Sequence, residues 1–349
     1  MAKILKNNYH IIWIENLRAI ATLAVVLLHV ASQMFYNFGK VSDMHWWASN
    51  LYINLGRFSV PCFIMITGAL ILGRNYNWKN FIKKRFLRIL CPFIFWSIIY
   101  IIYNLVRIIY KDSSKLNLNF ILEYIQNKLA YGASYQMWYI YMLIGIYLIF
   151  PIFNKWIINS NRKEQQYFLL ICLLNYLIQY LPIDFLKTDV NISFFSESLG
   201  YLVLGYYLTN NKFNFDGKKR FYFLILISVF LISYLTICID TYYSSIIKNS
   251  PIQKIKPWDL LQTISIFLLF LYIPYLNKKI RLLSIVNNYS FGIYLIHVLI
   301  MDLLAKAGLA YYSFNPYLSI PITFICTIFF SILVLYLLSK VPYGKYITR

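Results

Sequence analysis

Hydrophobic residues along the chain fall into long, nearly unbroken runs that are separated by short polar segments. Each run has about 17–25 residues, the length a helix needs to cross a bilayer at about 1.5 Å of rise per residue. The runs lack the apolar–polar alternation of membrane β-strands. The pattern therefore predicts an all-α, polytopic membrane protein with about ten transmembrane helices, at residues 10–32, 50–73, 89–110, 136–158, 166–184, 193–209, 221–240, 258–276, 283–304 and 316–339.

Basic residues are sorted between the segments that join these runs. Most of the 33 Lys and Arg lie in segments that face the cytosol if the N-terminus is cytoplasmic. This asymmetry is the positive-inside pattern of membrane proteins. It predicts that both termini are cytoplasmic, and it accounts for the net charge of +21 without nucleic acid as a partner.

Composition supports the same class of protein. The chain is 60% hydrophobic and only 13% charged, whereas soluble domains have about 25% charged residues. The first run is not followed by a signal-peptide cleavage site, which predicts a retained helix. The five cysteines lie in or beside apolar runs without metal-ligand spacing, so neither a disulfide nor a metal site is expected. A single membrane domain over residues 1–349 is the simplest organisation.

Three ionisable residues interrupt the first apolar run. Arg18 and His29 are eleven residues apart, and at roughly 100° per residue they return to nearly the same helix face. Glu15 and Thr22 extend this face into a polar stripe. A charge at the centre of a membrane helix costs about 2.5–3.5 kcal/mol on insertion scales, so such residues usually face a partner, a cavity or a reaction. Glu15, Arg18 and His29 are therefore the candidate catalytic residues, although Glu15 and Arg18 can also simply neutralise each other.

Further polar and aromatic residues fall in the outer half of the predicted bilayer. They are Arg57, Trp138, Tyr139, Glu197 and His297. Arg57 can pair with Glu197 or bind backbone carbonyls. The sequence leaves open whether these residues share one pocket with His29.

The densest basic segment is the predicted inner loop at residues 74–88. Its ordinary role is anchoring to anionic lipid. Its alternative role is binding a polyanionic cytosolic cofactor, because Arg85 and Arg88 lie three residues apart on one helix face beside Lys84, and arginine holds phosphate with two parallel hydrogen bonds.

Six motifs in order resemble the acyltransferase family 3 membrane acyltransferases, over nearly the whole chain. The matching residues are Arg18 and His29 in the first helix, Thr67 and Gly68, the basic pair Arg85 and Arg88 with Pro92 and Trp96, the group Trp138, Tyr139, Tyr147 and Pro151, then Gly205, and finally Tyr294 and His297. The chain looks like a short form with only the membrane domain, similar to the enterobacterial common antigen O-acetyltransferase type.

The resemblance implies a reaction and its participants. An acyl group, usually acetyl from acetyl-CoA, would move from cytosolic acyl-CoA to a hydroxyl of a cell-envelope glycan or lipid-linked sugar at the bacterial inner membrane. The basic motif carried by Arg85 and Arg88, with Lys84 beside it, would bind the CoA phosphates, and His29 would be the general base. No metal is expected.

The chemistry of acyl transfer suggests roles for the other polar residues. Arg18 and Arg57 are candidates for stabilising the oxyanion, and Glu15 for positioning Arg18. Glu15 lies fourteen residues from His29, so a carboxylate partner for His29 must come from elsewhere, with Glu197 the natural candidate. The acyl or acceptor pocket would then be shaped by Trp138, Tyr139, Tyr294 and His297. Two other classes of protein remain open: an exporter of a polysaccharide intermediate or small amino acid, and a membrane platform for a partner enzyme.

Overall fold

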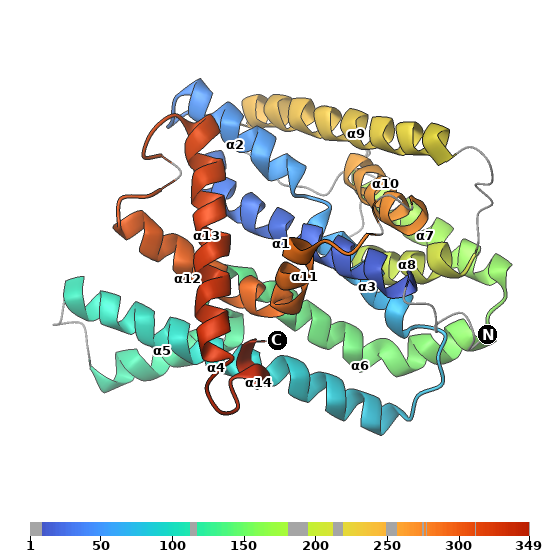
Figure 1. The fold of residues 1–349 in the computed structure, drawn as a ribbon, viewed down its shortest axis with the longest axis horizontal. Helices are drawn as coiled ribbons and strands as arrows, with labels where there is room; N and C mark the ends of the chain where they lie inside the picture. Colours follow the sequence, from blue (N-terminus) through green and yellow to red (C-terminus); the bar gives the residue numbers. More distant parts are fainter. Residues whose placement is uncertain are drawn as a thin grey trace.

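The computed structural model describes residues 9–111, 117–180, 195–211, 219–248, 257–273, 276, 278–310 and 312–348. All regular structure within these ranges is helical, which agrees with the predicted all-α class. The helices, labelled as in Figure 1, are α1 (Tyr9–Phe35), α2 (Asp43–Leu55), α3 (Ser59–Ile71), α4 (Trp78–Lys111), α5 (Leu118–Tyr131), η3 (Tyr135–Met137), α6 (Trp138–Asn159), α7 (Arg162–Tyr180), η5 (Phe195–Leu199), α8 (Gly200–Asn210), α9 (Lys219–Lys248), α10 (Pro257–Tyr272), α11 (Arg281–Asn288), α12 (Ser290–Lys306), α13 (Pro316–Leu338) and α14 (Lys345–Thr348).

Helices occupy all ten ranges predicted to span the membrane, but the ten full spans are not confirmed. Among the described residues, six stretches are long and apolar enough to cross a bilayer, namely Ile12–Phe35, Asp43–Ile71, Trp78–Lys111, Tyr135–Asn159, Lys219–Ile247 and Pro316–Leu338. A seventh span forms if α11 and α12, which are bent by 79°, count as one. The helices α8 and α10, with 11 and 16 residues, are shorter than the roughly 20 residues that a span requires. Parts of the predicted ranges 166–184 and 193–209 fall in residues 181–194, outside the described chain.

Helix α1 lies in the middle of the ribbon, with α9 and α4 towards opposite borders and α13 running steeply down the left part of the view (Figure 1). It packs against α2, α3, α10, α11, α12 and α13. Small residues on α1, including Ala19, Ala21 and Ala31, are completely buried. Small side chains let neighbouring membrane helices approach closely, so the stripe-bearing helix is surrounded by protein.

The crossing of α3 and α8 depends on two glycines. A Cβ atom added at Gly68 would overlap the backbone of Leu202, and one added at Gly205 would overlap the backbone of Met65. Each helix therefore presents a glycine to the backbone of the other, as in small-residue contacts between membrane helices. This contact fixes the interior position of the short helix α8.

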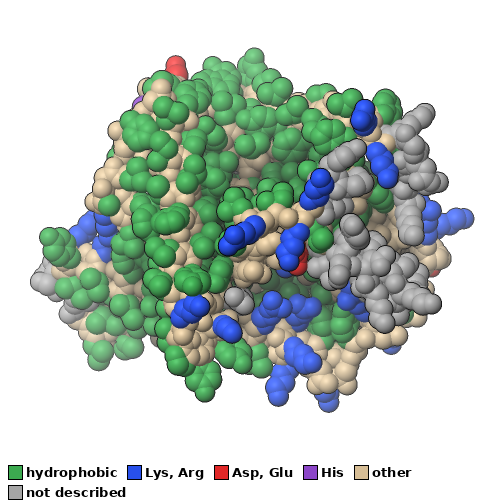
Figure 2. All heavy atoms as spheres, in the orientation of Figure 1, with side chains coloured by type: hydrophobic (Ala, Val, Ile, Leu, Met, Phe, Trp, Pro, Cys, Tyr) green, Lys and Arg blue, Asp and Glu red, His purple; other side chains and the backbone are tan. Residues whose placement is uncertain are grey.

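Polar contacts gather the predicted inner segments at one end of the molecule. The Asn154 amide donates to the carbonyl of Arg74 at 2.8 Å, and its oxygen accepts from the Gly73 N–H at 2.9 Å. The Asn16 amide donates to the carbonyls of Leu276 and Lys278. Figure 2 shows hydrophobic side chains over most of the visible face, with Lys and Arg gathered mainly towards its lower and right-hand parts. We call the end that carries the predicted inner segments, with these Lys and Arg side chains, the basic end.

Candidate active site

The structure brings the two predicted membrane histidines together. His29 on α1 and His297 on α12 have ring centroids 5.1 Å apart, with the ring planes inclined by 33°. The ring of Tyr135 contacts His29 from another side, at 5.3 Å between centroids. His297 is fully buried, and His29 is partly buried. The histidine pair, as we call His29 and His297, was not predictable from spacing because the two residues lie on different helices.

A network of buried hydrogen bonds fixes the turn of α12 that carries His297. The Tyr100 hydroxyl donates to the carbonyl of Leu295 and accepts from the N–H of Leu299, both at 3.0 Å. Gln136 donates to the Tyr100 hydroxyl at 3.0 Å, and the Tyr294 hydroxyl donates to the carbonyl of Gln136. These contacts tie α12 to α4 and η3, so His297 is carried on a rigid support.

A cavity of about 340 Å³ opens at the basic end and contains the predicted phosphate-binding arginines. Arg85 and Arg88 of α4 and Arg18 of α1 line it. Other lining residues come from α3, α6, α11 and α12; the polar ones are Thr67, Tyr139, Tyr147, Asn287, Asn288, Ser290 and Tyr294. Three arginines lining one cavity make a site suited to a polyanion.

Aromatic rings connect this cavity to the histidine pair. Tyr139 and Tyr294 line the cavity, and their ring centroids are 5.4 Å apart. Tyr294 also contacts His297, at 6.0 Å between centroids. Neither histidine lines the cavity itself. Tyr294 therefore links the cavity lining to His297, and we call Tyr139 and Tyr294 the aromatic neck.

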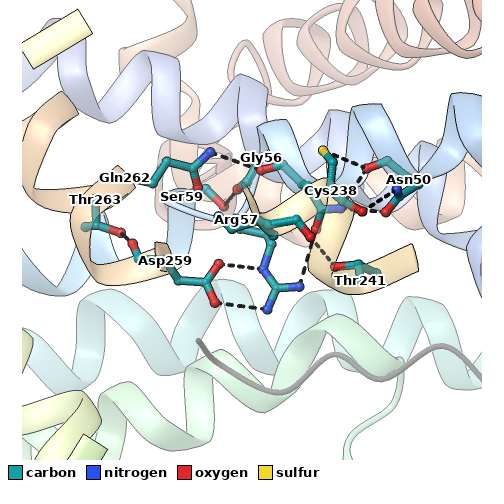
Figure 3. Close-up of polar contacts among 11 residues, drawn as sticks. Asn50, Gly56, Arg57, Ser59, Cys238, Thr241, Asp259, Gln262 and Thr263 are labelled. Carbon is teal, nitrogen blue, oxygen red and sulfur yellow. Dashed lines mark hydrogen bonds and ion pairs between the residues drawn. The ribbon is translucent and has the colours of Figure 1, made fainter. Parts of the chain in front are cut away.

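The predicted pairing of Arg57 with Glu197 is not found among the described contacts, in which Arg57 instead pairs with Asp259 (Figure 3). The Arg57 guanidinium donates to both carboxylate oxygens, at 2.7 and 3.1 Å, and the side chains are only 9% and 5% exposed. Arg57 lies at the break between α2 and α3, and Asp259 in the first turn of α10. The signal that could have revealed this contact is Asp259 itself, a carboxylate near the start of an apolar run. A buried carboxylate needs a cation as its partner.

Among the described contacts, the other predicted site residues neither line the cavity nor touch a histidine of the pair. Among the described contacts, Glu15 makes no hydrogen bond or ion pair with Arg18, and Glu197 makes none with His29. Lys84 is exposed on α4 and is not on the cavity wall. Trp138 is 53% exposed at the start of α6 and touches Tyr139 through ring contact.

Comparisons with known proteins identify the family of this chain. The model of the acyltransferase domain of acyltransferase family 3 matches residues 11–340. The chain is 24% identical over 297 residues to the "Putative membrane-bound acyltransferase YfiQ" of Bacillus subtilis (strain 168), covering 82% of this chain and 79% of that protein. No solved structure matches the chain. The protein is a membrane acyltransferase that belongs to acyltransferase family 3.

Proposed function

We propose that this protein is an O-acyltransferase of the bacterial inner membrane. It moves an acyl group, acetyl in the simplest case, from cytosolic acyl-CoA to a hydroxyl of a cell-envelope glycan or lipid-linked sugar. The observation that carries this proposal is a basic cavity whose lining contacts the histidine pair through the aromatic neck. The cavity faces the cytosol in this proposal, in keeping with the positive-inside pattern.

The donor binds with its phosphates on the arginines of the cavity. Arg85 and Arg88 are near the mouth, and Arg88 is the more exposed of the two. Arg18 lies deeper, on the central helix, and about 16 Å separates it from His29 along the axis of α1. The long pantetheine arm of CoA extends from the cavity through the neck of Tyr139 and Tyr294, and delivers the thioester to the histidine pair.

The reaction at the histidine pair is a transfer between a thioester and an alcohol. A nitrogen of His29 takes the proton of the acceptor hydroxyl while the oxygen attacks the thioester carbonyl. The carbon–sulfur bond of the tetrahedral intermediate then breaks, and His29 returns the proton to the CoA thiolate. The ester bond is formed and His29 is regenerated.

The remaining candidate residues take supporting roles in this scheme. Arg18 places a positive charge beside the bound donor. Glu15, one turn before it, is the candidate for positioning Arg18. Trp138 and Glu197 are candidates for acceptor contacts. Because Asp259 occupies its guanidinium, Arg57 is assigned to holding the α2–α3 break against α10, in place of oxyanion stabilisation.

Export of a polysaccharide intermediate is the second candidate, and one observation favours it. Among the described helices, α11 and α12 form a sharply bent pair at Tyr289, and a turn at Gly56–Phe58 interrupts the α2–α3 span. Discontinuous helices are a feature of many transporters. An exporter moves its substrate without acyl-CoA, so the two functions differ in their need for a donor.

The test is acyl transfer by the purified protein in detergent, with radiolabelled acetyl-CoA and candidate envelope glycans. We expect label in the glycan for the unaltered protein and a loss of about 100-fold or more for His29→Ala, because general bases contribute about 10²–10⁴-fold. His45→Ala is the matched control, since His45 is bonded to Ser42 near the start of α2, and should transfer normally. Unchanged transfer by His29→Ala would overturn the assignment of the base. Glycan transport without label transfer would favour the exporter.

A further inference from the structure

The backbone of α12 determines which ring nitrogen of His297 carries the proton. Its Nδ1 lies 2.8 Å from the carbonyl oxygen of Tyr294 and 3.1 Å from that of Ile293. Carbonyl oxygens only accept hydrogen bonds, so Nδ1 carries the proton. In the neutral ring, Nε2 is then a bare acceptor.

This acceptor is buried without a hydrogen-bond partner among the described residues. The His297 side chain is 0% exposed, and its Nε2 has no protein donor within reach. Buried polar atoms in folded proteins nearly always have a partner. An orphan acceptor beside a catalytic histidine therefore points to a contact that forms during the working cycle.

The neighbours of His297 leave His29 as the group that can complete this contact. Nδ1 faces the carbonyls of α12, so Nε2 lies on the opposite side of the ring. The recorded ring neighbours of His297 are His29, at 5.1 Å, and Tyr294. The Tyr294 hydroxyl is already donated to the carbonyl of Gln136. No carboxylate bonds either histidine among the described residues, so the usual partner of a catalytic histidine is missing.

We infer that His297 is the positioning residue for His29: its bare Nε2 accepts the N–H of His29, directly or through one water molecule. This inference rests on the proposed acyl transfer. The contact keeps the proton on the nitrogen of His29 that faces His297, which leaves the other nitrogen bare to take the proton of the acceptor hydroxyl. When that proton arrives, His29 carries two N–H groups, and His297 stabilises the resulting cation by accepting one of them. His297 thus performs for His29 the orienting role that an aspartate performs in a serine-hydrolase triad.

The test compares two substitutions of His297 in the full-length purified protein. His297→Met fills the volume without a strong acceptor, and we expect kcat to fall about 100-fold with little change in KM for acetyl-CoA, because His297 is not on the cavity wall. His297→Gln places an amide oxygen near the position of Nε2 and should restore at least a tenth of the unaltered kcat. Equal losses in both variants, or a rise in KM with kcat unchanged, would overturn the positioning role.

A second measurement separates this inference from the proposed function. In a protein that already carries His29→Ala, His297→Met should cause no further loss of the residual transfer, because both substitutions disable the same group. Multiplying losses would overturn the inference while leaving acyl transfer intact. Normal transfer by His29→Ala alone would instead remove the base on which the inference depends. Thermal unfolding in detergent checks that each variant is folded.

Discussion

The buried arginine Arg57 and the arginines that line the cavity differ in how their charges are balanced. Arg57 is neutralised by Asp259, and the pair is almost completely buried. Arg18, Arg85 and Arg88 instead line an open cavity, and no carboxylate among the described residues pairs with them. The first arrangement holds helices together, and the second leaves positive charge for a ligand.

Replacing the cavity arginines should weaken donor binding. We expect Arg85→Ala combined with Arg88→Ala to raise the dissociation constant of acetyl-CoA by about 100-fold, since a hydrogen bond to a charged group contributes about 1.5–3 kcal/mol. Isothermal titration in detergent measures this constant. Lys84→Ala with Lys83→Ala removes two neighbouring charges outside the cavity and serves as the control. Equal weakening in both double variants would show that general positive charge, not the cavity, binds the donor.

Breaking the buried ion pair should destabilise the fold without touching the histidine pair. Asp259→Ala removes the carboxylate that balances the buried Arg57 charge, and breaking a buried ion pair in this way costs about 3–5 kcal/mol in comparable cases. The measurement is the thermal unfolding midpoint in detergent. Arg57→Met combined with Asp259→Leu should recover much of the loss, because an apolar pair removes both buried charges. A double variant as unstable as the single one would contradict this account.

At the scale of helices, glycines and breaks decide how the elements meet. Gly68 and Gly205 bring α3 and α8 into backbone contact, and the break after α2 places Arg57 opposite α10. A run of apolar residues shows how much chain is hydrophobic but not where the helix bends. For this reason hydropathy located the helices among the described residues, whereas the number of full spans stays a prediction.

Adding a side chain at the α3–α8 contact should separate these helices. We expect Gly205→Ala to lower the unfolding midpoint strongly, because the new Cβ would overlap the backbone of Met65, which cannot move aside alone. Gly200→Ala on the same helix is the matched control, since its Cβ would meet only the Cys172 side chain, at 3.2 Å. Similar midpoints for the two variants would contradict the close-contact explanation.

The sequence predicted how residues of one helix are arranged, but it did not predict contacts between different helices. Glu15, Arg18 and His29 share α1, so helical periodicity was enough to place them along one stripe. The partner of Arg57 is 202 residues away in the chain, and the partner of His29 lies on α12, so neither contact leaves a local signal. Family resemblance identified His297 as a site residue, but only the packing of α1 on α12 shows what it touches.

At the scale of the whole molecule, the proposed reaction depends on which end of the protein faces the cytosol. We expect a cysteine at Lys79, near the basic end, to react with a membrane-impermeant maleimide only after the cells are opened. A cysteine at Lys40, in the loop after α1, should react in intact cells. Both side chains are exposed, and the five native cysteines are first replaced by alanine or serine. The reverse labelling pattern would invert the proposed direction of transfer.

The aromatic neck has an electrical consequence. A protein that takes its donor from one compartment and serves an acceptor in another must not become a pore, because protons leaking through it would dissipate the energy stored across the membrane. Tyr139 and Tyr294 line the cavity of about 340 Å³, whereas neither His29 nor His297 does. We therefore expect these rings to insulate the resting protein, and in the proposed reaction only the narrow arm of the donor would pass between them.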